Sequence, residues 1–297
     1  MILKTIKLGK HKLFKPHCLK LYLQLLITLT LNKMKNIFYI SILFLLATTS
    51  CQKVIDLKVD DAEPKMVIEA KYDVIKQEVF VKLSKTISVF SADNYPQINS
   101  ATVEITDANG VTTLLSNQGD GTYLLENYVP IFGSQYKIRI NVAGDIYEAS
   151  DDLVNVVPLD SLNAEFQEES PFSEEGYVIF MNATDPVGPN FYRAIRKVNG
   201  EYKREIRDQF LFDDSFSEGN TQSVPIFTEL YQVDDTVSIE LISYSKKSYT
   251  YFQELQDIAS GSGASAAPAN PTSNWSKEAL GHFTVFGYDT KTIIIKE

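Results

Sequence analysis

The sequence predicts an all-β body, an antiparallel sandwich followed by a second β-rich domain with one short helix. Apolar and polar residues alternate over many short segments, which is typical of strands buried on one face. Turn residues such as Asn109-Gly110 separate these segments, and no helical stretch comes between them in the first half of the body. Short strands at this spacing favour a sandwich over a mixed α/β fold.

The expected first domain covers residues 64–158 and opens at Pro64. Its clearest alternation lies in residues 136–142, where Tyr136 and Ile138 point to one face and Lys137 to the other. Asn109-Gly110 predicts a hairpin turn because both residues tolerate positive φ. The strands expected in this domain are 66–70, 79–84, 101–106, 111–115, 123–125, 136–142 and 146–149.

The expected second domain covers residues 159–297 and contains one helix, 247–260. Tyr251, Leu255 and Ile258 recur at helical spacing and predict the stripe that this helix buries. Residues 261–271 are small and punctuated by proline, so we expect a loop there. The strands expected in this domain are 164–167, 177–183, 191–198, 223–227, 236–243, 281–286 and 292–295.

Cys51 follows a segment with the layout of a bacterial secretory signal. Lysines precede an apolar run, residues 37–47, and small residues come directly before the cysteine. A spanning helix needs roughly 20 apolar residues, and this run is shorter. The layout therefore predicts a lipoprotein signal peptide over 34–50 that is cleaved before Cys51, whose sulfur is acylated, for example with palmitate. An uncleaved short membrane anchor is the alternative.

The segments on either side of this signal complete the expected organisation. Residues 51–63 form a short tether to the body. Residues 1–33 carry lysines and a second apolar stretch, and Met34 opens a start-like segment. We interpret 1–33 as a mis-assigned extension. A tandem hydrophobic hairpin is the alternative, and the lysines between the two apolar runs speak against it.

Composition excludes several classes of function. Residues 1–50 hold eight of the 28 basic residues and no acid, so the remainder has 20 basic and 38 acidic residues, a net charge of −18. Nucleic-acid binding needs a basic surface and is not expected. Beyond Cys51 there is no cysteine, and His282 is the sole histidine. A zinc site and a cysteine nucleophile are thereby excluded, and no metal or cofactor is expected.

The remaining candidate site residues have structural interpretations beside functional ones. A Ser–His–Asp arrangement would need His282, which we expect to be a surface or half-buried strand residue. The Asp107–Gly110 and Asn117–Gly121 turns lack the full calcium-loop pattern. Trp275 lies in a polar stretch and is a possible ligand contact, or it fixes the loop to the body. Acidic pairs recur, and we expect them in solvated loops: Asp60-Asp61, Asp151-Asp152, Asp213-Asp214 and Asp234-Asp235.

An ordered set of short motifs resembles domain-of-unknown-function family 4249, which consists of lipoproteins of Bacteroidetes-type bacteria. The matching segments are Cys51–Asp56, Glu63–Glu69, Val81–Thr86, Ala101–Asp107, Pro158–Leu162, Asn190–Arg193, Asn270–Asn274 and Ala279–Phe283. The resemblance implies an Ig-like first domain, a lipid-anchored outer-membrane protein with Cys51 as its attachment site, and association with TonB-dependent uptake receptors. It implies no catalytic residue. The acidic cluster that often follows the cysteine of surface-exported lipoproteins is replaced here by Gln52–Ile55, so a periplasmic and a surface location both stay open.

These observations favour a non-enzymatic binding or accessory protein beside a TonB-dependent receptor, attached to the membrane through Cys51. Two alternatives stay open. One is an adhesion or structural module of the envelope, which would contact other proteins through strand edges or loops. The other is a carboxylate-based glycan hydrolase, which needs two acids converging from different strands. The sequence does not determine the ligand or the oligomeric state.

Overall fold

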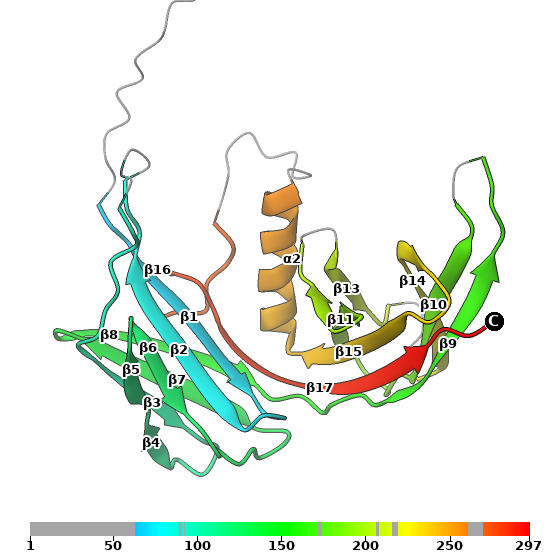
Figure 1. The fold of residues 1–297 in the computed structure, drawn as a ribbon. Coiled ribbons are helices and arrows are strands. Elements are labelled where there is room, and N and C mark those ends of the chain that lie inside the picture. The colour runs from blue at the N-terminus through cyan, green and yellow to red at the C-terminus, as the bar shows by residue number, and fades with distance from the viewer. Residues whose placement is uncertain are drawn as a thin grey trace, which may run out of the picture. The chain divides into compact units, whose positions relative to one another are not determined.

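The computed structural model describes residues 63–88, 91, 93–171, 174–205, 208–215, 219–260 and 270–297. The expected signal peptide, Cys51 and most of the loop at 261–271 lie outside these residues. The described chain is mostly β, with one helix, α2 (Lys246–Ser260), so the expected fold class is confirmed (Figure 1). None of the helices in this part of the chain is long and apolar enough to cross a membrane.

The first half forms an Ig-like sandwich. One sheet has the order β1-β2-β6-β5 and the other β4-β3-β7-β8, which is the ABED and C′CFG arrangement of Ig-like domains. Tyr136 near the start of β7 accepts a hydrogen bond from the backbone N–H of Ile131 at 2.7 Å, as the tyrosine corner of such domains does. The strands are β1 (Met66–Asp73), β2 (Glu78–Lys85), β3 (Ala101–Thr106), β4 (Thr112–Leu114), β5 (Ser116–Gly119), β6 (Thr122–Leu125), β7 (Gln135–Val142) and β8 (Asp145–Asp152).

The second half repeats this strand order. Its sheets are β9-β10-β14 and a second one in which β11 pairs with β15 on one side and with β12 and β13 on the other. They correspond to ABE and C′CFG, with β17 beyond β15 as the G strand. The strands are β9 (Leu159–Gln167), β10 (Gly176–Thr184), β11 (Phe191–Val198), β12 (Glu201–Lys203), β13 (Phe210–Asp213), β14 (Thr221–Tyr231), β15 (Thr236–Tyr244), β16 (Ala279–Leu280) and β17 (Phe283–Ile294).

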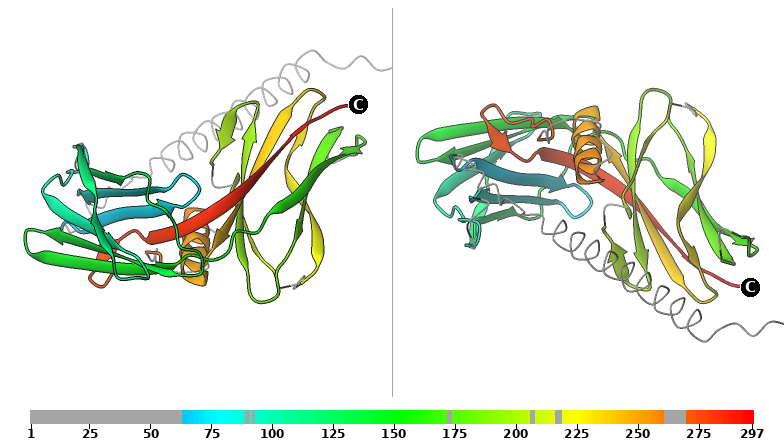
Figure 2. Two further views of the ribbon diagram at one scale, coloured as in Figure 1. Left: turned by 90° about the horizontal axis from the view of Figure 1, so that it is seen from below. Right: turned by 90° about the horizontal axis from the view of Figure 1, so that it is seen from above.

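Strand β17 belongs to both sandwiches. Residues 283–286 pair parallel with β1, and residues 287–294 pair antiparallel with β15 (Figures 1 and 2). The segment between β15 and β17 therefore passes from the second sandwich to the first through α2 and β16. Gly281, at φ +98°, lies against β1, where a Cβ would collide with the carbonyl oxygen of Ile68. Glycine is thus required at this crossing.

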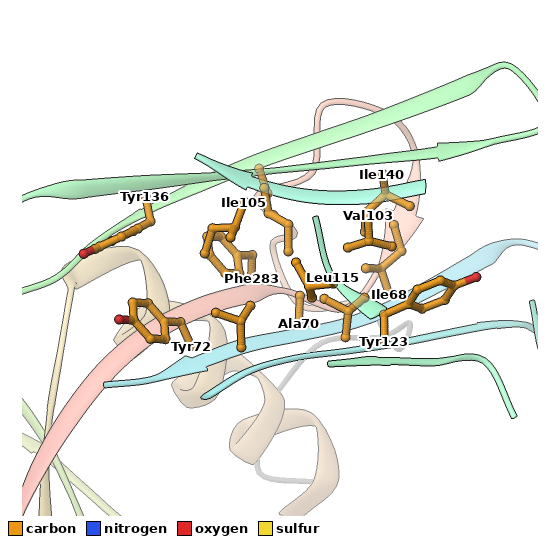
Figure 3. Packing of buried hydrophobic residues seen from close by; sticks show 14 of the residues in the cluster. Ile68, Ala70, Tyr72, Val103, Ile105, Leu115, Tyr123, Tyr136, Ile140 and Phe283 are labelled. Carbon is orange, nitrogen blue, oxygen red and sulfur yellow. The ribbon is translucent and has the colours of Figure 1, made fainter. Parts of the chain in front are cut away.

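The first core includes side chains that were expected in the second domain. Phe283 is fully buried among Ile105, Tyr72 and other residues of the first sandwich (Figure 3). Trp275, Ala279 and Val285 belong to the same cluster. The expected boundary at 158/159 therefore does not describe residues 275–286, which complete the first sandwich. The alternating pattern located the strand at 281–286 but not the sheet that it joins.

Helix α2 packs on the outer face of the second sandwich, but only through part of the stripe expected for it. Ser248 and Tyr249 are its buried residues, and Phe252 stacks on Tyr244 of β15 at 5.1 Å. Leu255 and Ile258 are each 38% exposed. The expected stripe was therefore wrong for Leu255 and Ile258, whereas Tyr251 is half-buried and stacks on His282.

Candidate functional site

A buried polar cluster lies where helix α2 begins. Ser245 is the N-cap residue: its Oγ accepts a hydrogen bond from the backbone N–H of Ser248 at 3.2 Å, and its carbonyl accepts one from Tyr249 at 2.9 Å. A side-chain oxygen at this position satisfies an N–H that has no partner inside the helix. Both serines are buried. The helix start is therefore fixed inside the protein rather than at its surface.

Asp151 of β8 holds this cluster together. It is fully buried, and its Oδ1 accepts a hydrogen bond from the Ser245 hydroxyl. Its Oδ2 accepts one from the Ser248 hydroxyl at 2.7 Å and one from the backbone N–H of Val285 in β17 at 2.8 Å. One carboxylate thus connects the last strand of the first sandwich, the start of α2 and the shared strand. The expectation of a solvated loop for the Asp151-Asp152 pair is wrong for Asp151 and also for Asp214, which is 7% exposed.

Burial raises the pKa of Asp151, although its hydrogen bonds act in the opposite direction. The ionised form is costly in a low-dielectric interior, and the donors around it offset that cost. The N-terminus of α2 also favours a negative charge nearby. The network is therefore organised around a carboxylate, and each of its three named donors depends on that carboxylate for its partner.

His282 adjoins the same cluster. It is 5% exposed, its Nε2 lies 3.3 Å from the Ser248 Oγ, and its ring stacks on Tyr251 at 4.6 Å. Burial, with a smaller effect of Lys247, lowers the pKa of His282 to about 4. The expectation of a surface or half-buried strand histidine was wrong, because residue 282 precedes β17 and lies beneath the helix.

The arrangement does not have the geometry of a serine hydrolase. In such a site the histidine lies between the serine and the aspartate and takes the serine proton. Here the serine lies between: Ser248 donates to Asp151 and adjoins His282, and it is fully buried. A hydroxyl without access to substrate cannot attack one. The described residues contain no group of three or more His, Cys, Asp or Glu that could hold a metal ion.

A cleft of about 300 Å³ lies beside this cluster, between the end of β8 and the starts of β11 and α2. Phe191 and Tyr244 supply aromatic surface, and Asn190 adds an amide. Asp152 and Lys246 bring one charge of each sign to its lining. Ligand sites commonly combine apolar walls with a few polar groups in this way, and they favour domain boundaries. The cleft can accept a small polar molecule with an apolar part.

Asp152 is the only acid among the residues that line this cleft. A smaller cavity of about 20 Å³ inside the second sandwich is also lined by one acid, Asp185, whose Oδ1 accepts a hydrogen bond from the Tyr192 hydroxyl at 2.5 Å. A glycoside hydrolase needs two carboxyl groups facing the same bond. Neither of these two spaces brings such a pair together.

Trp275 lies in the first core and not at a surface. It is 7% exposed and belongs to the buried cluster of the first sandwich. The neighbouring Asn274 fixes the segment by bonding Phe283 in both directions, each at 2.9 Å. Of the two interpretations of Trp275, the position agrees with fixing the loop to the body. The lipid-attachment residue, Cys51, lies outside the described residues.

Sequence reasoning missed Asp151, Ser245 and Ser248 as a group. A local signal was present, because Ser245 precedes the helix and serine is a preferred N-cap residue. No local signal connects it to Asp151, which lies 94 residues earlier. Of the two stretches considered for calcium, Asp107–Gly110 is an ordinary turn, since the Asp107 Oδ1 accepts from the N–H groups of Asn109 and Val111, both at 2.9 Å. In the other stretch, residues 117–119 belong to β5, and the turn is confined to Asp120 and Gly121.

Comparison with protein families finds one whose model, described as Domain of unknown function (DUF4249), matches residues 52–292. No curated protein matches the chain. Solved structures that overlap it include a two-domain fibronectin type-III segment of chicken tenascin, 11% identical over 61% of this chain and 90% of that chain with a TM-score of 0.20. The chicken interferon gamma receptor alpha chain is 11% identical, and the match covers 61% of this chain and 88% of the receptor chain with a TM-score of 0.19. A bacterial ice-binding adhesin is 10% identical, and the match covers 79% of this chain and 65% of the adhesin chain with a TM-score of 0.17. TM-scores this low carry no argument about this chain.

Proposed function

Because the chain belongs to the DUF4249 family, whose description leaves the activity open, we propose that it is a lipid-anchored, non-enzymatic binding protein of the bacterial envelope. Lipid on Cys51 holds it to the outer membrane. There it acts as an accessory to a TonB-dependent uptake receptor and captures or passes on a nutrient. The membrane face on which it works, periplasmic or external, is part of what the experiment must decide.

The observation that supports a binding role most directly is the cleft beside α2. It combines aromatic walls with a single Asp and a single Lys, which suits recognition of a small polar molecule better than cleavage of one. The catalytic arrangement that His282 could have formed is closed and engaged in structural hydrogen bonds. What the site offers to solvent is therefore a place to bind.

The tether supports the anchoring part of the proposal. Cys51 precedes Glu63, the first described residue, by twelve positions, and an extended chain spans at most about 3.5 Å per residue. The body can therefore stand up to roughly 40 Å from the lipid. That reach allows contact with a neighbouring membrane protein without burying the body in the bilayer.

The test is palmitate labelling of the full chain, followed by crosslinking of intact outer membranes and mass spectrometry of what is recovered with it. Cys51→Ala should abolish the label, and the matched change Cys18→Ala should leave it. Label together with a specific TonB-dependent receptor supports the proposal. Label without any receptor removes the accessory role, and a chain that carries no label at Cys51 overturns the anchoring on which the proposal rests.

The two alternatives give different results in the same preparation. An adhesion module should bind another envelope protein or whole cells without a receptor. A glycan hydrolase should release reducing sugar, and Asp152→Asn should abolish the release while folding is retained, because Asp152 is the acid that the cleft presents. Added protease before crosslinking, on intact cells, separates a surface location from a periplasmic one.

A further inference from the structure

Strand β9 forms one edge of the three-stranded sheet β14-β10-β9. It pairs with β10 without a break from Ser161, opposite Asn182, to Gln167, opposite Gly176. No strand among the described residues pairs with its other side. Figure 1 shows this hairpin, labelled β9 and β10, at one side of the second sandwich. An edge of this kind presents a row of backbone N–H and C=O groups that can pair with another chain.

Several other edges in the described part of the protein are protected or short. β14, at the opposite side of the same sheet, contains Pro225, which cannot donate a ladder hydrogen bond. The edge of β8 is covered, because the Glu148 carbonyl accepts from the Ser276 N–H at 2.7 Å and the Glu148 N–H donates to the Ser276 Oγ at 3.0 Å. β4 and β5 have only three and four residues. β9 has nine residues and contains no Pro, Lys or Arg.

The hairpin that forms this edge, β9 and β10 with the residues between them, carries acidic residues and no basic one. No Lys, Arg or His occurs between Arg139 and Arg193, a stretch that contains eleven Asp and Glu residues. Six of these eleven lie on β9 or on the turn that follows it: Asp160, Glu165, Glu168, Glu169, Glu174 and Glu175. A strand added at this edge would therefore be stabilised by Lys or Arg side chains and opposed by acidic ones.

An aromatic pair lies at the same end of the hairpin. Phe166 is 54% exposed and contacts Tyr177 edge to face, with ring centroids 5.2 Å apart. Exposed aromatic surface next to a free backbone edge offers an apolar contact to a side chain of an added strand. The edge thus combines backbone pairing groups, negative charge and an apolar anchor.

We propose that the outer edge of β9, over Leu162–Phe166, is a docking strand that accepts an extended, basic segment of a partner protein by strand addition. A second copy of this chain is the wrong occupant, because it would bring Glu165 and its acidic neighbours against their own copies, on bodies that each carry a net charge of −18. The inference names the chemistry of the partner segment and holds whichever envelope protein supplies it. It therefore stands or falls separately from the receptor association proposed above.

The test uses an eight-residue peptide of alternating valine and lysine as the probe, added to the chain from residue 52 onward. Hydrogen exchange should slow at least tenfold for those amides of 162–166 that face away from β10, and it should stay unchanged in β14. The same peptide with N-methylated backbone, and a valine–glutamate peptide, should each bind at least tenfold more weakly. Glu165→Lys should weaken binding of the valine–lysine peptide at least fivefold, whereas Glu126→Lys, an exposed acid of the first sandwich, should not.

Several outcomes overturn the proposal. Equal binding of the N-methylated peptide shows non-specific charge attraction without strand addition. Equal weakening by Glu165→Lys and Glu126→Lys shows that the net charge and not the edge attracts the peptide. Protection in β14 instead of β9 places the docking strand elsewhere. Concentration-dependent dimerisation of the free chain that Glu165→Lys changes identifies a second copy as the occupant.

Discussion

The two sandwiches share a strand order but differ in what fills and closes them. The first has a core of aliphatic and aromatic side chains, and its buried carboxylates, Asp73 and Asp151, lie near the ends of β1 and β8. It completes that core with Trp275 and Phe283, which lie more than 120 positions beyond its last strand, β8. The second encloses a charge: Arg196 on β11 is 2% exposed and bonds Asp208 at 2.7 Å and Glu229 at 2.6 Å. The same topology can therefore be closed by recruiting distant apolar residues or by a polar network. Each solution makes its half sensitive to a different kind of change.

The largest expected effect lies at the junction, on which both halves depend. Asp151→Ala removes the acceptor of two buried hydroxyls and one backbone N–H. We expect the free energy of unfolding to fall by about 3–5 kcal/mol, because breaking a buried charged network leaves its donors unsatisfied. Urea unfolding of the chain from residue 52 onward measures the change.

The matched control is Asp152→Ala, on the opposite face of the same strand. Its side chain is 49% exposed, and its ion pair with Lys247 is 3.8 Å long. We expect a change of at most about 0.5 kcal/mol there. Equal effects of the two substitutions would show that the buried network contributes little and that the junction is held by apolar contacts alone.

The first sandwich should be vulnerable to loss of its recruited residues. Trp275→Ala should cost about 3–5 kcal/mol, as other Trp-to-Ala changes in cores do. Since Trp275 packs in the first core, native-state hydrogen exchange should accelerate more in β1 and β7 than in β10 and β14. Tyr95→Ala, at a side chain that is 60% exposed, is the control and should leave exchange unchanged. Uniform acceleration throughout would mean that the two sandwiches unfold as one unit.

The second sandwich should be vulnerable at its buried charge. Arg196→Met keeps most of the side-chain volume but leaves Asp208 and the Tyr231 hydroxyl without the guanidinium, so we expect a loss of about 3 kcal/mol. Arg139→Met is the counterpart in the first sandwich. Arg139 is 50% exposed and its ion pairs are 3.4 and 4.0 Å long, so we expect about 0.5 kcal/mol. If denaturant titrations give similar losses for both, the contrast between the two interiors is not energetic.

Sequence reasoning succeeded where the information is local. Alternation located the strands around Tyr136 and Ile138, and the Asn109-Gly110 turn joins β3 to β4 as expected. The bounds of α2 were predicted to within one residue at its start. Strands β5, β12, β13 and β16 were missed, since each has four residues or fewer, too few for a clear period.

The information that was missing is long-range. Nothing in the periodicity of residues 283–286 indicates that they join β1 and not a strand of the second sandwich. The burial of Asp151 and Arg196 is likewise set by partners far along the chain. Polar residues are expected at the surface by default, and only the assembled fold reveals the groups that satisfy them inside. The site at the start of α2 was therefore invisible to local patterns even though each of its residues is ordinary in sequence.

The smallest expected effect is a pH dependence from His282, which distinguishes the polar junction from the two cores. Its pKa in the folded protein is about 4, against about 6.5 in an unfolded chain. Between pH 6.5 and pH 4 the unfolded chain binds a proton at His282 and the folded protein does not. The contribution of the neutral His282 to the free energy of unfolding is therefore fully present above pH 6.5 and is lost as the pH falls toward 4. We expect a loss of about 2 kcal/mol between pH 7 and pH 4.5 that is absent in His282→Phe. His282 is the sole histidine beyond Cys51, so the difference between the stability profiles of the two proteins reports on His282 alone. Asp151, whose pKa is raised, changes the stability in the opposite direction over this range, and it does so in both proteins. Parallel stability profiles of the two proteins over this range would mean that His282 stays accessible to protons in the folded state and is not enclosed beneath the helix.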